Sequence, residues 1–170
     1  MRYIFLFLLS LGLYALPVQA EELDPADTLV KVASKAPDFS TVCTDNTPFV
    51  LSQQKGHLVL LNFFTDWCSA CMREMPHLEN EVWKKYKDKG LVVLCIGREH
   101  SLKEVSQLKE ARKWTLPMAA DPKRQIYGKY AKKIIPRIFL IDKSGKVIYE
   151  TADFDLLEFK KMLQIIDSNL

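Results

Sequence analysis

Two runs of large apolar residues constrain the fold of this chain more than any other feature. Residues 57–64, HLVLLNFF, form a nearly unbroken apolar run, and residues 91–97, LVVLCIG, form a second. Such runs are typical of central strands that are covered on both faces. Between them, apolar residues recur at three- and four-residue steps and so share one helical face: Met72, Met75, Leu78, Val82 and Tyr86. The order strand, helix, strand predicts a parallel crossover unit.

The rest of the chain predicts three more helices and a hairpin. Ser101 and Glu104 have the spacing of a capping box at the start of a second helix. Asp121-Pro122 favours a third helix, with Asp as cap and Pro in the first turn, and a closing helix is predicted from Asp155. Residues 138–142 and 146–150, split by turn residues, read as a β-hairpin. We therefore predict an α/β fold in which helices flank both faces of a central mixed β-sheet.

The first twenty residues have the pattern of a secretory signal peptide. A cationic start at Arg2 precedes an apolar stretch, and small residues follow at the positions typical of cleavage after Ala20. A retained membrane anchor is the alternative, but the apolar stretch is short for a bilayer span. We predict a signal peptide over 1–20, a flexible lead over 21–35 and one domain over 36–170.

Charge and cysteine content restrict the function further. The chain of 170 residues carries 24 basic and 21 acidic side chains, so we expect no nucleic-acid partner. An exported chain enters an oxidising compartment, where disulfides form and persist. The four cysteines of the chain therefore each need an explanation.

Cys68 and Cys71 are predicted to form a redox-active pair. They lie in the stretch FFTDWCSACMREMP, after a predicted strand and at the start of a predicted helix. Free N–H groups and the helix dipole stabilise a thiolate there, and such sites lower the pKa of cysteine from about 8.5 to roughly 3.5–7.5. Cys68 would attack a partner's sulfur, and Cys71 would then resolve the mixed disulfide.

Other interpretations of the pair are weaker. A zinc site usually needs four ligands, and the sequence has no second CxxC or paired-His motif. Haem attachment requires His where this chain has Met72. Copper(I) favours sulfur ligands and Met75 is also near, while a structural disulfide across so tight a loop would stabilise little. We predict no metal and no cofactor.

Four segments carry a resemblance to a known family. They are APDF at 36–39, LNFFTDWCSAC at 61–71, REMPHL at 73–78 and IIPRIFLIDKSGKVIY at 134–149. From Ala36 to its C-terminus the chain resembles the thioredoxin superfamily, and most closely its exported TlpA/ResA-like branch. This resemblance implies a thioredoxin-like fold and thiol–disulfide oxidoreductase activity.

The resemblance also implies roles for residues around the pair. Ile135-Pro136 would form the loop whose cis-proline faces the cysteines and helps a partner's backbone to dock. Glu74 would tune the thiols and assist proton transfer, although an exposed first-turn glutamate is the simpler alternative. Trp67 would offer a flat contact surface to a partner, unless it packs in the core.

The chain departs from the family pattern at three places. Ser69-Ala70 stands where proline is common between the cysteines, so the reduction potential cannot be transferred from the family. Arg137 follows the proline where Thr is common; it could hold the thiolate, favour an acidic partner or point to solvent. Asn62 replaces the buried acid of thioredoxins proper, which shifts the expected proton transfer to Glu74.

The remaining cysteines and histidines are expected to have no catalytic role. Cys95 lies within an apolar run and reads as core, although a disulfide between Cys43 and Cys95 stays open. His57, His77 and His100 show no ligand spacing and are expected on the surface or in loops: three histidines in all.

The leading hypothesis is an exported, periplasmic thiol–disulfide oxidoreductase, acting as a reductant and as a monomer. Its partners would be cysteine-containing client proteins, with a membrane thiol reductase as electron donor, as the resemblance implies. One alternative is a peroxiredoxin-type peroxidase, suggested by Thr65 before Cys68, although that chemistry typically wants Pro where the chain has Leu61. Another is a copper(I)- or client-binding protein that uses the same sulfurs.

Overall fold

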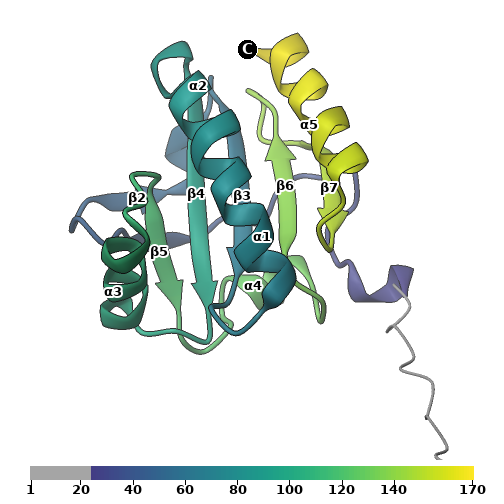
Figure 1. Ribbon diagram of the computed structural model, residues 1–170. Coiled ribbons are helices and arrows are strands. Elements are labelled where there is room, and N and C mark those ends of the chain that lie inside the picture. The colour runs from purple at the N-terminus through teal and green to yellow at the C-terminus, as the bar shows by residue number, and fades with distance from the viewer. Residues whose placement is uncertain (1–23) are drawn as a thin grey trace, which may run out of the picture.

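A five-stranded mixed sheet forms the centre of the molecule (Figure 1). The structure is a computed structural model that describes residues 24–170, so the predicted signal peptide lies outside the described residues. The strand order is β5-β4-β3-β6-β7. Strands β3, β4 and β5 are parallel to one another, β6 runs antiparallel to β3, and β7 runs antiparallel to β6. The bounds are β3 (Leu58–Phe64), β4 (Leu91–Arg98), β5 (Met118–Asp121), β6 (Arg137–Ile141) and β7 (Val147–Ala152).

The two apolar runs are the central strands β3 and β4, as predicted. Every residue of β3 is buried, and β4 has one half-buried residue in an otherwise buried strand. The hairpin prediction is also confirmed, because β6 and β7 pair antiparallel around the turn at Ser144-Gly145. The α/β fold with a central mixed sheet is therefore confirmed.

The helix predicted between β3 and β4 is present but is not uniform. It begins as α1 (Ser69–His77), continues as a π-helical segment η3 (Leu78–Trp83) and ends in α2 (Lys84–Tyr86) and the short 3-10 helix η4 (Lys87–Lys89). Pro76 lies inside α1 and supplies no N–H to the helical ladder. Gly90 closes the segment with a φ of 90°, a left-handed conformation that glycine adopts without strain.

The two other capped helices lie where predicted. Helix α3 (Leu102–Arg112) begins at a complete capping box between Ser101 and Glu104. Helix α5 (Leu156–Asn169) begins at Asp155, whose carboxylate accepts hydrogen bonds from the first turn. Both predictions rested on local hydrogen bonds that the sequence pattern specifies directly.

The helix predicted to open at Asp121-Pro122 is wrong in its position. Residues 118–121 form β5, and α4 (Tyr127–Tyr130) begins only after a turn. The Asp121 carboxylate still accepts N–H bonds from the α4 entrance, at Gln125, Ile126 and Tyr127. Asp121 thus caps across a longer turn, because the parallel pairing of β5 with β4 keeps the chain extended to this residue.

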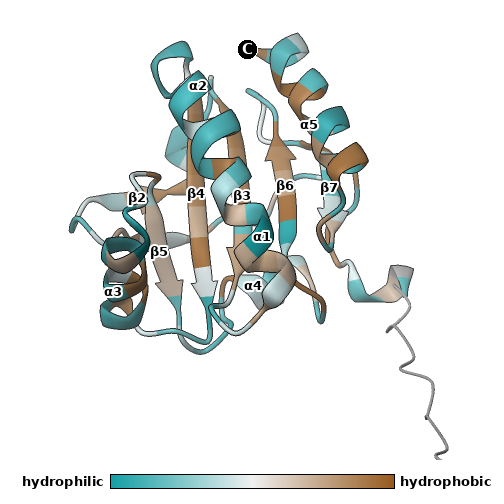
Figure 2. Cartoon of the chain, viewed as in Figure 1, coloured by the Kyte–Doolittle hydropathy of each residue, from teal (hydrophilic) through white to brown (hydrophobic). Residues whose placement is uncertain are grey.

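Two apolar layers cover the sheet. On one side lie the buried faces of α1, η3 and α5, with Met75, Leu78 and Met162 among their core residues. On the other side lie α4 and the N-terminal part of the domain, which includes β1 (Ser40–Val42), β2 (Pro48–Val50) and the 3-10 helix η2 (Leu51–Gln54). Figure 2 shows hydrophobic strands in the centre and hydrophilic residues on the outer helix faces.

The domain begins earlier than predicted. After the 3-10 helix η1 (Pro25–Asp27), Thr28 forms a bridge with Ala131, and the Ala33 N–H donates to the Val147 carbonyl. The flexible lead predicted to reach residue 35 is therefore corrected: from Thr28 the chain packs on the domain, through these backbone bonds and the buried side chain of Val30. None of the helices within residues 24–170 combines the length and apolar character needed to cross a membrane.

Candidate active site

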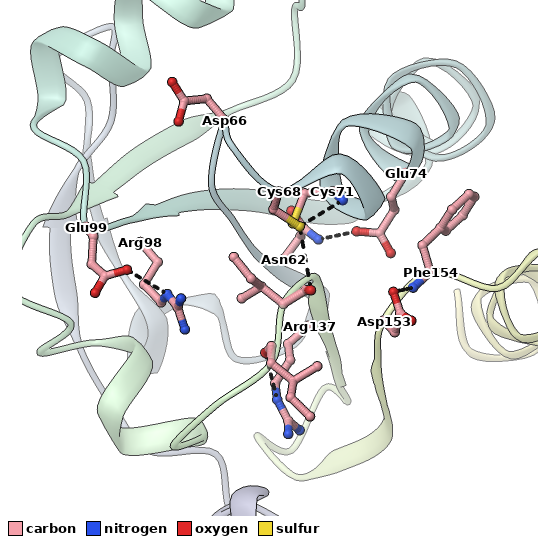
Figure 3. Close-up of a disulfide and its surroundings, with 12 residues drawn as sticks. Asn62, Asp66, Cys68, Cys71, Glu74, Arg98, Glu99, Arg137, Asp153 and Phe154 are labelled. Atoms are coloured by element: carbon pink, nitrogen blue, oxygen red, sulfur yellow. Dashed lines mark hydrogen bonds and ion pairs between the residues drawn. A yellow bond between two sulfur atoms is a disulfide. The ribbon is translucent and has the colours of Figure 1, made fainter. Parts of the chain in front are cut away.

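Cys68 and Cys71 form a disulfide at the N-terminus of α1 (Figure 3). Strand β3 ends at Phe64, and a three-residue turn delivers Cys68 as the N-cap residue of the helix. The two Cα atoms are 5.2 Å apart. The prediction that the CxxC pair follows the central strand and opens the helix is confirmed.

The two sulfurs differ in access to solvent. Cys68 is 9% exposed, whereas Cys71 is completely buried. The Sγ atom of Cys68 accepts the backbone N–H of Cys71 at 3.1 Å. A free N–H group directed at this sulfur, together with the positive end of the helix dipole, stabilises a Cys68 thiolate in the reduced protein. Cys68 is therefore the sulfur that another molecule can reach and the one that the helix activates.

The segment before β6 lies against the exposed sulfur. The Ile135–Pro136 peptide bond is cis, as the resemblance implied. The carbonyl oxygen of Ile135 is 3.6 Å from the Sγ atom of Cys68 (Figure 3). This segment and the start of α1 come from distant parts of the sequence, and the pairing of β6 with β3 brings them together.

Glu74 is buried behind the disulfide and is not an exposed first-turn residue. It is 2% exposed, and its carboxyl accepts a hydrogen bond of 2.6 Å from the Asn62 side-chain amide. Burial raises the pKa of Glu74 to about 8, against the opposing hydrogen bond from Asn62 and with help from the nearby charge of Asp153. Glu74 lies one helical turn after Cys71 on the buried face of α1, so it is a buried acid that holds its proton at neutral pH.

Trp67 lies on the surface beside the exposed sulfur. Its side chain is 66% exposed, which excludes the simple core-packing alternative. An exposed indole ring next to Cys68 is a contact surface for a partner. Binding there would cost little conformational entropy, because the side chain has few rotatable bonds. The arrangement is compatible with docking of a partner at Cys68.

Arg137 does not lie where any of the three sequence-based alternatives placed it. It is completely buried, and in Figure 3 it points away from the disulfide. Its Nε donates to the carbonyls of Lys133 and Ile134, and one terminal nitrogen donates to Thr28 Oγ1 at 2.7 Å. Glu150 lies 3.7 Å from the same nitrogen. The prediction that the Arg137 side chain contacts substrate is therefore corrected. The side chain is buried, and its hydrogen bonds hold the loop before β6 from the inner side.

Two features of the site were not predicted. The sequence analysis treated Asn62 as a lost acid, yet its amide is the direct partner of Glu74. His100, expected on the surface or in a loop, lies in a loop but is buried beside the turn before Cys68, where its Nε2 is 3.2 Å from the Asp66 N–H nitrogen and 3.0 Å from the Asp66 carboxylate. The apolar neighbours of Asn62 hinted at burial, but no sequence signal connected His100 to Asp66.

Cys43 and Cys95 do not form a disulfide. Both are free and buried, and they belong to the apolar layers on opposite sides of the sheet. Burial, with the nearby Glu74 charge as a smaller cause, raises the pKa of Cys95 well above its ordinary value. The prediction that Cys95 is unpaired core is confirmed. Within residues 24–170, no group of three or more His, Cys, Asp or Glu side chains is arranged to hold a metal ion.

The fold and the cysteine pair together define a thioredoxin-like thiol–disulfide oxidoreductase. Residues 32–150 match the AhpC/TSA family, and the chain belongs to this family. It is 36% identical to the thiol-disulfide oxidoreductase ResA of Geobacillus kaustophilus, over 71% of this chain and 68% of that protein. It is 33% identical to ResA of Bacillus cereus, over 70% of this chain and 68% of the relative.

A solved structure supports the same assignment. The solution structure of a protein from Bacteroides thetaiotaomicron, described as a candidate protein disulfide isomerase, superimposes with a TM-score of 0.81. The two sequences are 33% identical, and the match covers 85% of this chain and 93% of that one. The thioredoxin-like fold and the enzyme class inferred from the sequence are therefore confirmed.

The buried Glu74 makes a prediction about stability. The pKa of about 8 in the folded protein lies above the ordinary value of 4.5, so the folded state keeps a proton that the unfolded state releases between these values. Stability is therefore lost as pH rises through this window, by at most about 1.4 kcal/mol per pH unit for one proton. We expect Glu74→Gln to flatten the fall in unfolding free energy between pH 5 and 8, measured by urea denaturation of the oxidised protein.

The matched control is Glu110→Gln, which removes an exposed carboxylate from α3 and should leave the slope unchanged. Equal slopes of unfolding free energy against pH in the wild type and in Glu74→Gln would contradict a raised pKa of Glu74 in the folded protein.

Proposed function

We propose that the chain is exported, loses residues 1–20, and works in the periplasm or an equivalent compartment as a monomeric reductant of protein cysteines. The N-terminal pattern supports export, and the ResA relatives support the class of reaction. The observation that carries the proposal is the difference in access between the two residues of one disulfide, since Cys68 is 9% exposed and Cys71 is completely buried.

The first step is attack by the Cys68 thiolate on a partner's disulfide. A bond forms between Cys68 Sγ and one partner sulfur, the partner's S–S bond breaks, and its second sulfur leaves as a thiolate. The helix N-terminus stabilises the attacking thiolate, and the exposed Trp67 and the Ile135 carbonyl, 3.6 Å from Cys68 Sγ, are the contacts for the partner.

The second step releases the partner as a dithiol. Cys71 gives up its proton and attacks Cys68 Sγ, which forms the Cys68–Cys71 disulfide and expels the partner's remaining sulfur. In molecules whose Glu74 is ionised, its carboxylate, one turn away on the same buried helix face, accepts the Cys71 proton. Two electrons thus pass to the partner, and a membrane thiol reductase would return two electrons to the cysteine pair.

Trapping of the mixed disulfide tests the order of attack. We expect Cys71→Ser to accumulate a covalent complex with a disulfide-containing protein, because Cys68 can attack but nothing resolves the bond. Cys68→Ser should form no complex and should lose at least about 100-fold of the exchange rate. Non-reducing electrophoresis with mass mapping of the bond is the measurement.

Cys95→Ser serves as the matched control, since it removes a buried thiol outside the pair and should retain exchange. A complex formed through Cys71 in the Cys68→Ser variant would overturn the assignment. Steady consumption of hydrogen peroxide, without exchange on protein disulfides, would favour the peroxidase alternative.

The reduction potential of the pair tests the direction of transfer. A reductant should equilibrate with graded dithiol buffers near or below about −270 mV, which is the thioredoxin range. A value near about −120 mV would instead mark an oxidant of new thiols. Cys71→Ser is the control, because it cannot show a two-electron transition.

Processing of the N-terminus tests export. The protein recovered from the periplasm of an expressing Gram-negative cell should begin at Glu21 when its N-terminus is sequenced. Recovery of the intact chain, fixed in the membrane fraction, would contradict cleavage.

A further inference from the structure

A small cavity lies beside the buried Glu74 side chain. It lies between α1 and the connection from β7 to α5, and Glu74, Thr151, Asp153, Asp155 and Glu158 are among its lining residues. Its volume of about 10 Å³ has room for about one water molecule. Figure 3 shows Glu74 on α1 and Asp153 beyond the end of β7, facing the same region. Three further acidic residues therefore line the same cavity as Glu74.

The three carboxyl groups are not equivalent. The Asp155 carboxylate is turned toward α5, where it accepts the N–H groups of Leu157 and Glu158. Glu158 forms an ion pair of 2.6 Å with Lys161. Asp153 is exposed, and its carboxylate accepts only its neighbour's N–H among the bonds of the described residues. Its charge is thus the one left to act across the cavity.

The position of Asp153 is fixed by the backbone. Its N–H donates to the Pro136 carbonyl at 2.9 Å, in the same segment that faces Cys68. Its φ of 64° is left-handed, which Asp and Asn tolerate better than other side chains. The backbone bond therefore holds Asp153 beside the loop that contains Pro136.

The other groups around Glu74 do not supply a compensating positive charge at its carboxyl. From β3 comes the neutral amide of Asn62, and from β4 comes the buried thiol of Cys95. On its own helix lie Cys68 and Cys71. Arg73 and His77 line a separate hollow near the surface, together with Phe154 and Asp155.

We propose that Asp153 is a positioning residue for proton transfer: its negative charge, acting across the cavity, sets the pH at which Glu74 releases its proton to or accepts it from the cysteine pair. This inference rests on the proposed function, because it assigns regulation of the same site. A carboxylate that lies opposite another carboxyl disfavours the second negative charge. The raised pKa of Glu74 agrees, since burial is its main cause and the Asp153 charge adds to it.

The proton balance is closed within the site and solvent. When a donor thiolate attacks Cys68 Sγ, the Cys68–Cys71 bond breaks, Cys71 leaves as a thiolate, and Glu74 gives its proton to that sulfur. The Glu74 carboxylate then faces the charge of Asp153, which favours its return to the protonated form by taking a proton from water. The donor's second thiolate completes the two-electron reduction by displacing Cys68.

The test is a titration of Glu74 in the oxidised full chain, followed by carbon NMR of the side-chain carboxyl. Asp153→Asn keeps the left-handed backbone and removes the charge, and it should move the Glu74 midpoint toward acid by about 0.5 to 1 pH unit. Asp155→Asn is the matched control, because it removes an equal charge from the same cavity and Asn still caps α5. It should shift the midpoint by less than half as much.

A second readout links the titration to chemistry. The rate of reduction of the oxidised protein by dithiothreitol, measured against pH, should show the same acid shift in Asp153→Asn. The shift should vanish when both proteins also carry Glu74→Gln. An unchanged Glu74 midpoint in Asp153→Asn, or an equal shift in Asp155→Asn, would overturn the inference. Because the carboxyl titration needs no exchange activity, failure of the proposed function would leave it readable.

Discussion

The register of β3 with its two neighbours determines where the chemistry of this protein lies. Strand β3 is buried along its whole length, between parallel β4 and antiparallel β6. Its end at Phe64 starts the turn that makes Cys68 a helix cap. The pairing of Phe63 with Arg137 places the segment before β6 at this same end, so the Ile135 carbonyl faces the sulfur. A shift of one residue between β3 and β6 would turn the β6 side chains to the other face and separate the two halves of the site.

Two buried polar side chains of this apolar frame, Asn62 and Glu74, meet behind the disulfide. Asn62 is the single polar residue of β3, and its amide reaches across to Glu74, while its Oδ1 has no hydrogen-bond partner among the described residues. An unsatisfied buried acceptor costs about 1–3 kcal/mol. The core keeps this cost and a buried carboxyl one helical turn after Cys71. The neutral amide of Asn62 can donate a hydrogen bond to Glu74 without adding the second buried charge that an aspartate would bring. An asparagine at this position of β3 is therefore compatible with a buried acid on α1.

Elements encoded by local pattern could be predicted, and those set by distant contacts could not. Apolar runs, the capping box at Ser101 and the Asp155 cap each express their structure within a few residues. Strand β5 has only four residues, two of them alanine, and its Asp121 is equally suited to ending a strand or capping a helix. The packing of residues 28–35 combines backbone bridges with contacts of Thr28 and Val30 to distant parts of the chain, and neither is visible in a local pattern. Within the site, the cysteines follow from the motif, whereas the burial of Glu74 and Arg137 follows from which elements close over them.

Arg137 shows how a departure from the family pattern can leave the reactive surface unchanged. Four consecutive carbonyls in the loop before β6 have partners on different sides of the loop. Those of Lys133 and Ile134 accept bonds from Arg137 Nε and from the Tyr127 hydroxyl beneath the loop. The Ile135 carbonyl faces Cys68, and the Pro136 carbonyl accepts the Asp153 N–H. Because a guanidinium has donors for inward carbonyls and none for a partner's backbone once it is buried, the long side chain fixes the loop from inside. The outward side of the loop then presents backbone near Cys68 and Trp67, and the arginine side chain stays buried.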